Sequence, residues 1–302
     1  MFKSKNSMSR ALVRRETTAG YLFLLPSLFF FVTFVLYPMF LCIYTSFFDS
    51  NMGKNAVDVF VGLGNYKELF RDKLFLGALK NTVVIVVVAV PTVCAFSLWV
   101  ATAIYDMKPA LTSAFRCIFY LPVVTGSVAV TVVWKWMYNS RYGVFNYLFK
   151  SLGIIDQNIN WLGDARFALW CIILILFTTS VGQPIVLYVS ALGNVDHSLV
   201  EAAQVDGANR RQVFWKIKWA QIMPTTLYIL IITTINSFQC FALIQLLTSG
   251  GPTHSTDTIM YYIYYTAFKL YRYGYGNAMG FVLMIIIAVL SAVQFKLGQQ
   301  SD

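Results

Sequence analysis

The chain has 302 residues, of which 58% are hydrophobic and only 12% are charged, and its mean hydropathy is +0.64. A soluble domain usually carries about 25% charged residues, so the composition excludes an ordinary soluble domain and indicates a membrane protein. The net charge of +10 would suggest nucleic-acid binding in a soluble protein. Here the basic residues stand at the ends of apolar runs and in the loops between them, where they orient spans and meet anionic headgroups.

The first predicted element is a basic leader over residues 1–19, which contains Lys3, Lys5, Arg10, Arg14 and Arg15. It precedes a long apolar run at Tyr21–Phe48. A secretory signal peptide has an apolar core of only about 7–15 residues and a small-residue cleavage site. This run is about twice that length and has no obvious site, so it is predicted to remain as a membrane helix.

Six runs reach the ~20 mostly apolar residues that a membrane-spanning helix needs. The predicted spans are Tyr21–Phe48, Thr82–Tyr105, Cys117–Trp136, Phe167–Leu192, Pro224–Leu247 and Ala278–Phe295. They predict an all-α, polytopic membrane protein with a membrane domain over residues 20–297 and a short tail at 298–302. An even number of spans puts both termini on one side, and the density of Lys and Arg favours the cytoplasm for that side.

Prolines occur within several of these spans, at Pro38, Pro91, Pro122 and Pro184. Each removes a backbone N–H and kinks its helix, which membrane helices tolerate when neighbours satisfy the freed carbonyls. Two interpretations stay open: ordinary irregularity of membrane helices, or bent helices that leave a central cavity.

Metal and disulfide chemistry finds no support in the sequence. The five cysteines form no CxxC pair, and His197 and His254 are predicted to lie in different compartments. The aromatic stretch Tyr261–Tyr265, placed just before the last span, is interpreted as an interfacial belt in preference to a platform for a sugar ring.

A polar segment interrupts the apolar pattern between the fourth and fifth spans, over residues 193–223. Burying the six charged side chains of residues 199–224 in the bilayer would cost ~15–20 kcal/mol, so the segment is predicted to lie outside the membrane. Ser198 is predicted to cap a first short helix, with Glu201 completing a capping box. Gly207 then allows a turn, and a second short helix follows, with Phe214 and Ile217 on one face.

This segment resembles the EAA loop of ABC-importer permeases, in the stretch "EAAQVDGANRRQVFWKIKWAQIMP" at 201–224. One departure is Ala220, where the family usually has a proline. The stretches "AGYLFLLPSLFFFVTFVLYP" (19–38), "FVGLGNYKELF" (60–70), "FRCIFYLP" (115–122), "LLTSGGPTHSTDTIMYYIYYTAF" (246–268) and "GYGNAMG" (274–280) are similar to the maltose-type carbohydrate branch, particularly its first permease subunit. The matching loop positions are Glu201, Ala202, Ala203, Asp206, Gly207, Ala208, Phe214, Ile217 and Pro224.

The resemblance implies a transporter subunit in a bacterial cytoplasmic (inner) membrane, with six spans, a cytoplasmic helix-turn-helix coupling loop and both termini in the cytoplasm. The loop would dock on an ATPase subunit. That subunit, and not this chain, would bind ATP and Mg²⁺. Implied partners are a second related permease, two ATPase copies and an extracytoplasmic solute-binding protein. The chain is expected to be neither an enzyme nor its own ATPase, since it has no HExxH and no GxxxxGK[ST] motif.

A substrate path is expected where polar residues stand inside spans, because such residues are costly in lipid. The candidates are Gly182, Gln183, Asn236, Ser237 and Gln239. Neutral amides and hydroxyls suit sugar hydroxyls, but the same groups also form hydrogen bonds between helices, and both interpretations stay open. The resemblance favours a di- or oligosaccharide, with glycerol phosphate or another small polar solute as the alternative. A self-contained secondary transporter is disfavoured because the spans carry almost no charge.

Overall fold

The computed structural model describes the backbone of residues 4–50 and 58–299 and the side chains of residues 13–50 and 58–298. Within these ranges the chain is mainly helical, with one small antiparallel sheet, so the predicted all-α class is confirmed. The elements are α1 (Ser4–Phe31), η1 (Val32–Leu36), α2 (Tyr37–Thr45), β1 (Phe48–Asp49), β2 (Val59–Phe60), α3 (Gly64–Leu69), α4 (Lys73–Tyr105), α5 (Pro109–Val124), α6 (Ser127–Met137), α7 (Val144–Ser151), α8 (Ala168–Ser180), α9 (Gly182–Gly193), α10 (His197–Val205), α11 (Arg210–Val213), η2 (Phe214–Lys218), α12 (Trp219–Phe238), α13 (Ala242–Leu247), α14 (Ile259–Tyr264), η3 (Tyr265–Lys269) and α15 (Tyr273–Gln299).

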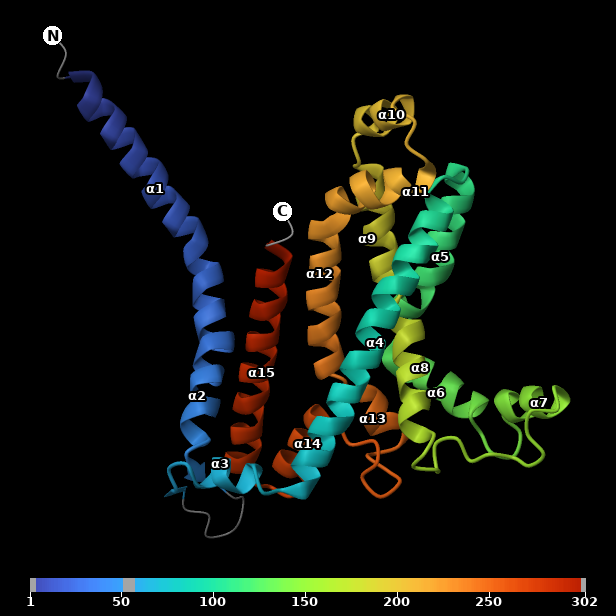
Figure 1. Ribbon diagram of the computed structural model, residues 1–302. Helices are drawn as coiled ribbons and strands as arrows, with labels where there is room; N and C mark the ends of the chain where they lie inside the picture. Colours follow the sequence, from blue (N-terminus) through green and yellow to red (C-terminus); the bar gives the residue numbers. More distant parts are fainter. Residues whose placement is uncertain (1–3, 51–57, 300–302) are drawn as a thin grey trace.

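Five helical segments of the described residues are long and apolar enough to cross a membrane, and α5 with α6 makes a sixth if the pair counts as one broken span. The predicted number of spans agrees with this upper count. The five are Val13–Thr45, Lys73–Tyr105, Ala168–Gly193, Arg210–Leu247 and Tyr273–Gly298. The start of α1 and the end of α15 lie on the same side of the molecule as α10, which we call the α10 side (Figure 1). Helices α3, α7 and α14 lie on the opposite, far side.

The first span belongs to a single long rod of α1, η1 and α2 that stands away from the other helices over much of its length (Figure 1). None of its most apolar window is buried within the chain, and only α2 packs closely, against α15. The helix passes through the boundary of the predicted leader without a break, since α1 already begins at Ser4. The rod therefore presents an apolar surface to lipid or to another protein.

The prediction of one continuous third span at Cys117–Trp136 was wrong. The chain forms α5 and α6, which meet at an angle of 95°. Thr125 and Gly126 between them are extended, with ψ of 127° and 139°. Pro122 has no N–H to bond the preceding turn, and glycine adopts non-helical conformations at little steric cost, so the helix ends in this region in spite of its apolar composition.

The core on the α10 side is built by α4, α9 and α12. Val93, Ile185 and Ile229 are fully buried where these helices meet. The fourth predicted span corresponds to α8 and α9 and is confirmed as one membrane-spanning unit. At Gly182, the first residue of α9, a Cβ would meet the Phe119 carbonyl oxygen and lie 2.9 Å from Cγ2 of Val123. Glycine therefore permits close approach of α9 to α5.

Helix α4 begins at Lys73, nine residues before the predicted start at Thr82. Asp72 caps it, because its Oδ1 accepts the backbone N–H of Leu74 at 2.8 Å. The extra turns carry Lys73, Lys80 and Asn81, which the hydropathy of the sequence assigned to a loop. A helix can continue past the apolar region when a cap and tertiary contacts support its polar end.

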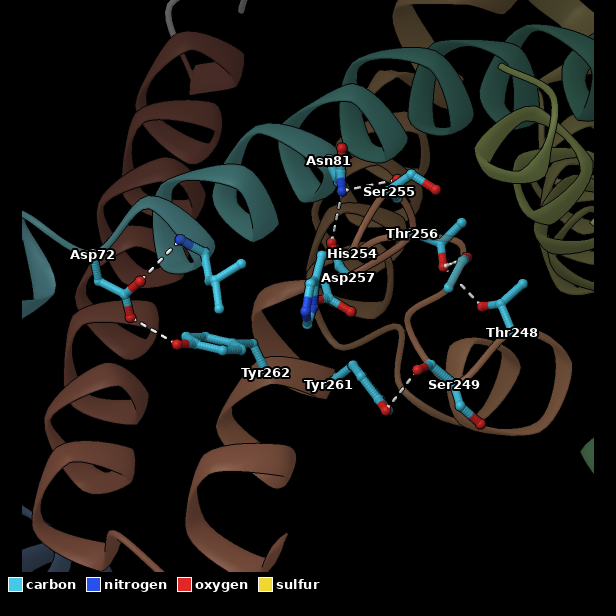
Figure 2. Close-up of polar contacts among 12 residues, drawn as sticks. Asp72, Asn81, Thr248, Ser249, His254, Ser255, Thr256, Asp257, Tyr261 and Tyr262 are labelled. Carbon is cyan, nitrogen blue, oxygen red and sulfur yellow. Dashed lines mark hydrogen bonds and ion pairs between the residues drawn. The ribbon is translucent and has the colours of Figure 1, made fainter. Parts of the chain in front are cut away.

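On the far side, polar contacts join the start of α4 to α14 and to the loop at 248–258 (Figure 2). A further contact joins it to α15. Oδ2 of Asp72 accepts the hydroxyls of Tyr262 at 2.7 Å and Tyr275 at 2.8 Å. Nδ2 of Asn81 donates to the carbonyl oxygens of Ser255 and Asp257 at 3.1 and 3.0 Å. These contacts tie the start of α4 to segments more than 170 residues later in the chain.

The interpretation of Tyr261–Tyr265 as an interfacial belt was wrong for its first two residues. Tyr261 and Tyr262 are only 7% and 5% exposed. The hydroxyl of Tyr261 donates to the Ser249 carbonyl oxygen at 2.9 Å, and that of Tyr262 donates to Asp72. Tertiary partners that are distant in sequence hold these rings inside the far-side cluster.

Candidate functional site

The polar segment at 193–223 forms a projecting helix-turn-helix on the α10 side (Figure 1). Helix α10 begins one position after Asp196, whose Oδ1 accepts the Ser198 N–H at 2.9 Å. The predicted cap at Ser198 was therefore wrong: Ser198 is already the second residue of the helix, and Glu201 is too far along it to close a capping box. Hydrogen bonds from Ser198 hold the pKa of Asp196 below its usual value. Asp196 is the cap because it is the last residue with an extended backbone before the helix.

The turn between the two helices has the geometry that its glycine predicts. Gly207 has φ of +83°, a conformation in which a Cβ is penalised. The N–H of Ala208 donates to the Ala203 carbonyl at 2.9 Å, and the N–H of Gly207 donates to that of Gln204 at 3.0 Å. This pair of bonds is the Schellman arrangement, which satisfies the last carbonyls of α10.

A capping box does occur in the loop, but at the second helix. Asn209 Oδ1 accepts the Gln212 N–H at 2.9 Å, and Gln212 Oε1 accepts the Asn209 N–H at 2.8 Å. From Arg210 the helix continues through η2 into α12, so Pro224 lies inside a helix and does not mark a separate start of the span. In Figure 1, α11 runs across the end of α9 before the chain turns into α12. The predicted second short helix is thus continuous with the helix of the fifth span.

Half of the eight candidate coupling residues face solvent in the isolated chain. Glu201, Ala202, Asp206 and Gly207 are exposed, and the side chain of Val205 is 87% exposed at the end of α10. The other four candidates are half-buried, namely Ala203, Ala208, Phe214 and Ile217. No residue of α10 is fully buried, and its partly buried Val200 packs against the core on the α10 side. A cap, a Schellman turn and a second cap also fix its shape.

The second candidate site is a cavity of about 180 Å³ between α8, α9 and α12. It brings together Gln183 from α9 and Asn236 from α12, two residues that the sequence proposed for the substrate path. Hydroxyl groups add to the same wall, from Thr179, Ser180 and Thr233. The remaining lining residues are apolar: Val123, Pro184, Leu187 and Ile232. The lining therefore offers neutral hydrogen-bonding groups and no charge.

The other proposed path residues lie elsewhere. Gly182 and Ser237 are buried and do not line this cavity. Gln239 lines a separate, larger and mainly apolar cavity of about 690 Å³, which it shares with Asn277 of α15. Thr233 was not proposed from the sequence, although its place one helical turn before Asn236 on α12 is a signal that could have found it.

No group of three or more His, Cys, Asp or Glu side chains that could hold a metal ion occurs among the residues that the structure describes. The five cysteines are all free, and three of them, Cys94, Cys171 and Cys240, are half-buried or buried. Neither candidate site thus contains a set of metal ligands among its described residues.

Comparisons with known proteins show which family has this architecture. Residues 61–299 match the family model described as "Binding-protein-dependent transport system inner membrane component". The probable ABC transporter permease protein YesP of Bacillus subtilis (strain 168) is 33% identical over 94% of this chain and 91% of its own. The lactose transport system permease protein LacF of Rhizobium radiobacter is 32% identical over 94% of this chain and 95% of its own.

A crystal structure of a bacterial alginate ABC transporter, in complex with an alginate pentasaccharide-bound periplasmic protein, contains a chain of the same fold. The TM-score is 0.82, with 23% identity over 95% of this chain and 96% of that chain. The sequence matches agree with the helical architecture. This chain therefore belongs to the family of inner-membrane components of binding-protein-dependent transport systems, and it is a multi-pass permease subunit of an ABC transporter.

Proposed function

We propose that this chain is the first-type permease subunit of an ATP-driven importer for a neutral di- or oligosaccharide. The cavity shared by Gln183 and Asn236 carries this proposal, because its polar groups are neutral amides and hydroxyls. Such groups match the hydroxyls of a sugar, and burying them in a span is costly unless they serve a function or bond another helix. The relative whose name specifies lactose transport supports the same substrate class.

The composition of the cavity also bears on the alternative solute. A glycerol phosphate carries a charge of about −2, and a site in a low-dielectric membrane would need Arg or Lys to bind it. None of the residues that line the cavity is charged. We therefore favour an uncharged sugar over glycerol phosphate for this chain.

A second, related permease is proposed to complete the path. Gln183 and Asn236 are exposed in the isolated chain although both belong to membrane-spanning helices. Lipid would leave their amides without hydrogen-bond partners, whereas a facing permease could enclose a polar path between the two subunits. The exposed apolar rod of α1 and α2 offers further surface for that partner.

The α10 loop is proposed to couple this path to ATP. In this scheme each permease docks one loop on one of two ATPase copies, and closure of the ATPase dimer moves the loops and rocks the spans. The support is the preformed shape of α10 and its exposed Glu201, Asp206 and Val205. Because α11 continues into α12, a displacement of the loop would be transmitted directly to the helix that carries Asn236. ATP and Mg²⁺ belong to the partner, and this chain is proposed to have no catalytic role.

The α10 side is proposed to face the cytoplasm, with both termini, and the far side to face the solute-binding protein. The loop at 193–223 carries Arg210, Arg211, Lys216 and Lys218, as the positive-inside rule prefers for a cytoplasmic loop.

The test is ATP-dependent uptake of a labelled disaccharide by the reconstituted four-component importer. We expect Gln183→Leu and Asn236→Leu each to reduce uptake by about tenfold, since each loses hydrogen bonds worth about 1.4 kcal/mol or more. Gln239→Leu, which changes the other cavity, should have a smaller effect. Assembly of the complex, measured by co-purification, serves as the control for folding. Normal uptake by both cavity variants, or equal losses in all three, would contradict the assignment of the path.

A further inference from the structure

A second polar cavity, of about 490 Å³, lies between the α10 loop and the ends of the spans. Its walls come from the end of α4, the end of α9, α10 and the helix formed by α11 and η2. Arg210 and Lys218 line it, together with His197, Asp106 and Tyr105. The proposed coupling mechanism does not use these five residues, so the cavity calls for a separate explanation.

The cavity has an excess of positive charge. Two permanent cations line it against one carboxylate. Within the described part of the chain, the ion pairs are Arg166 with Asp164, His254 with Asp257 and Arg272 with Glu68. Neither Arg210 nor Lys218 belongs to one of them, and Asp106 is not paired with either cation. Nζ of Lys218 lies 5.2 Å from the centroid of the Tyr105 ring, which orients it beside the end of α4.

The depth of the cavity suits a headgroup. Tyr105 is the last residue of the α4 span, and Leu192, which also lines the cavity, is one residue from the end of the α8–α9 span. The cavity therefore lies where the hydrocarbon region gives way to water. Basic pockets between helices at this depth on the cytoplasmic side attract the phosphates of anionic lipids.

We propose that this cavity binds a phosphate-bearing anion, either the phosphodiester headgroup of an anionic lipid or a soluble phosphate ester. Arg210 would supply a planar, bidentate donor and Lys218 a point charge. The two residues are eight positions apart on one helix, about 12 Å at the usual rise, so long side chains can approach one phosphate from its two ends. A bound anion would also hold the α10 loop against the ends of α4 and α9.

Neighbouring residues supply matched controls. Arg211 and Lys216 are exposed on the same helix, one and two positions away from the proposed ligands, and they do not line the cavity. Arg210→Gln and Lys218→Gln remove a charge from the cavity, whereas Arg211→Gln and Lys216→Gln remove the same charge from the surface beside it. Thermal unfolding of each variant verifies that the fold is kept.

The measurement is native mass spectrometry of the assembled importer taken from nanodiscs of phosphatidylglycerol and phosphatidylcholine. We expect phosphatidylglycerol to stay bound, and the two cavity variants to weaken its retention by about tenfold, as loss of one charged hydrogen-bonding group predicts. The two surface variants should change retention much less. Equal losses in both pairs, or no retained phosphatidylglycerol and no phosphate binding in any form, would overturn the proposal.

A second arm distinguishes the two sources of the phosphate. Glycerol 1-phosphate is titrated into the delipidated importer in a detergent without phosphate. Binding that depends on Arg210 and Lys218 but is not accompanied by lipid retention assigns the cavity to a soluble ester. Retention of phosphatidylglycerol without binding of the free ester assigns it to lipid.

Discussion

The carboxylate of Asp72 serves three helices at once. It caps α4 through Oδ1 and accepts the hydroxyls of Tyr262 in α14 and Tyr275 in α15 through Oδ2. Burial alone would raise the pKa of Asp72, but the hydrogen bonds from the two tyrosines and from the backbone outweigh it and hold the pKa below its ordinary value of 3.8. The ionised form is therefore the one that the folded state stabilises.

The lowered pKa of Asp72 predicts how the stability of the fold depends on pH. The contribution of Asp72 is fully present above its ordinary pKa and is lost as the pH falls through the lowered pKa. Tyr262→Phe removes one charge-assisted hydrogen bond and should cost about 1–2 kcal/mol of unfolding free energy at pH 7. The difference from the wild type should shrink below about pH 4.

Unfolding of the purified chain in detergent, followed at several pH values, measures the effect. Tyr264→Phe is the control on the same helix, because no hydrogen bond of its hydroxyl occurs among the described residues. A loss that is equal in both variants, or one that is independent of pH, would show that the Asp72 contacts do not stabilise the far side.

At the scale of helices, Gly182 sets how closely α9 approaches α5. Gly182→Ala introduces a methyl group against the Phe119 carbonyl and Val123, and we expect it to destabilise the chain by about 1–3 kcal/mol, as overpacking does. Gly77→Ala is the matched control, since a Cβ at this position of α4 meets nothing within 4 Å. It should leave stability unchanged or raise it slightly. The measurement is the melting temperature of each purified variant. Equal melting temperatures would contradict the close contact between α9 and α5.

An element could be predicted from the sequence when its cause is local, and could not when tertiary packing decides its structure. Long apolar runs are local signals, so the existence of the spans was predictable. The bend between α5 and α6 was predictable only as a kink at Pro122, because a proline inside an apolar run is compatible with a single bent span, and the 95° break was not predictable from the run. The caps of the α10 loop were predicted only in part: Asp196 and Ser198 are both good caps two positions apart, and the backbone conformation chooses between them.

The candidate cavity was predictable to a similar degree. Polar residues in spans pointed to Gln183 and Asn236, and the structure brings these two together. The sequence could not tell which side of α12 faces α9, so it grouped Gln239 with them although Gln239 lines the other cavity. Nor could it show that Tyr262 meets Asp72, a partner 190 residues away.

At the scale of the whole molecule, the arrangement in Figure 1 puts α10 and the far-side loops at opposite ends of the spans. With the α10 side in the cytoplasm, a cysteine at Arg211 should react with an impermeant maleimide only after permeabilisation. A cysteine at Ser249 should react in intact cells. Both are introduced into a variant without the five native cysteines, because Cys42 and Cys117 are exposed in the isolated chain. The reverse labelling pattern would overturn the orientation.

The central claim is that α10 couples this permease to the ATPase, and one charge reversal tests it most directly. We propose that Glu201 meets a basic residue of the ATPase. Glu201→Lys should then reduce recovery of the ATPase subunits with the purified membrane part, and ATP-driven uptake, by tenfold or more, because like charges at a docked interface cost several kcal/mol. Gly207→Val, which forces a branched side chain into a conformation with φ of +83°, should have the same effect. Asp156→Lys, an equal reversal at an exposed residue between α7 and α8, should change neither. If Glu201→Lys and Gly207→Val retain the ATPase and transport at the wild-type rate, the α10 loop is not the coupling element.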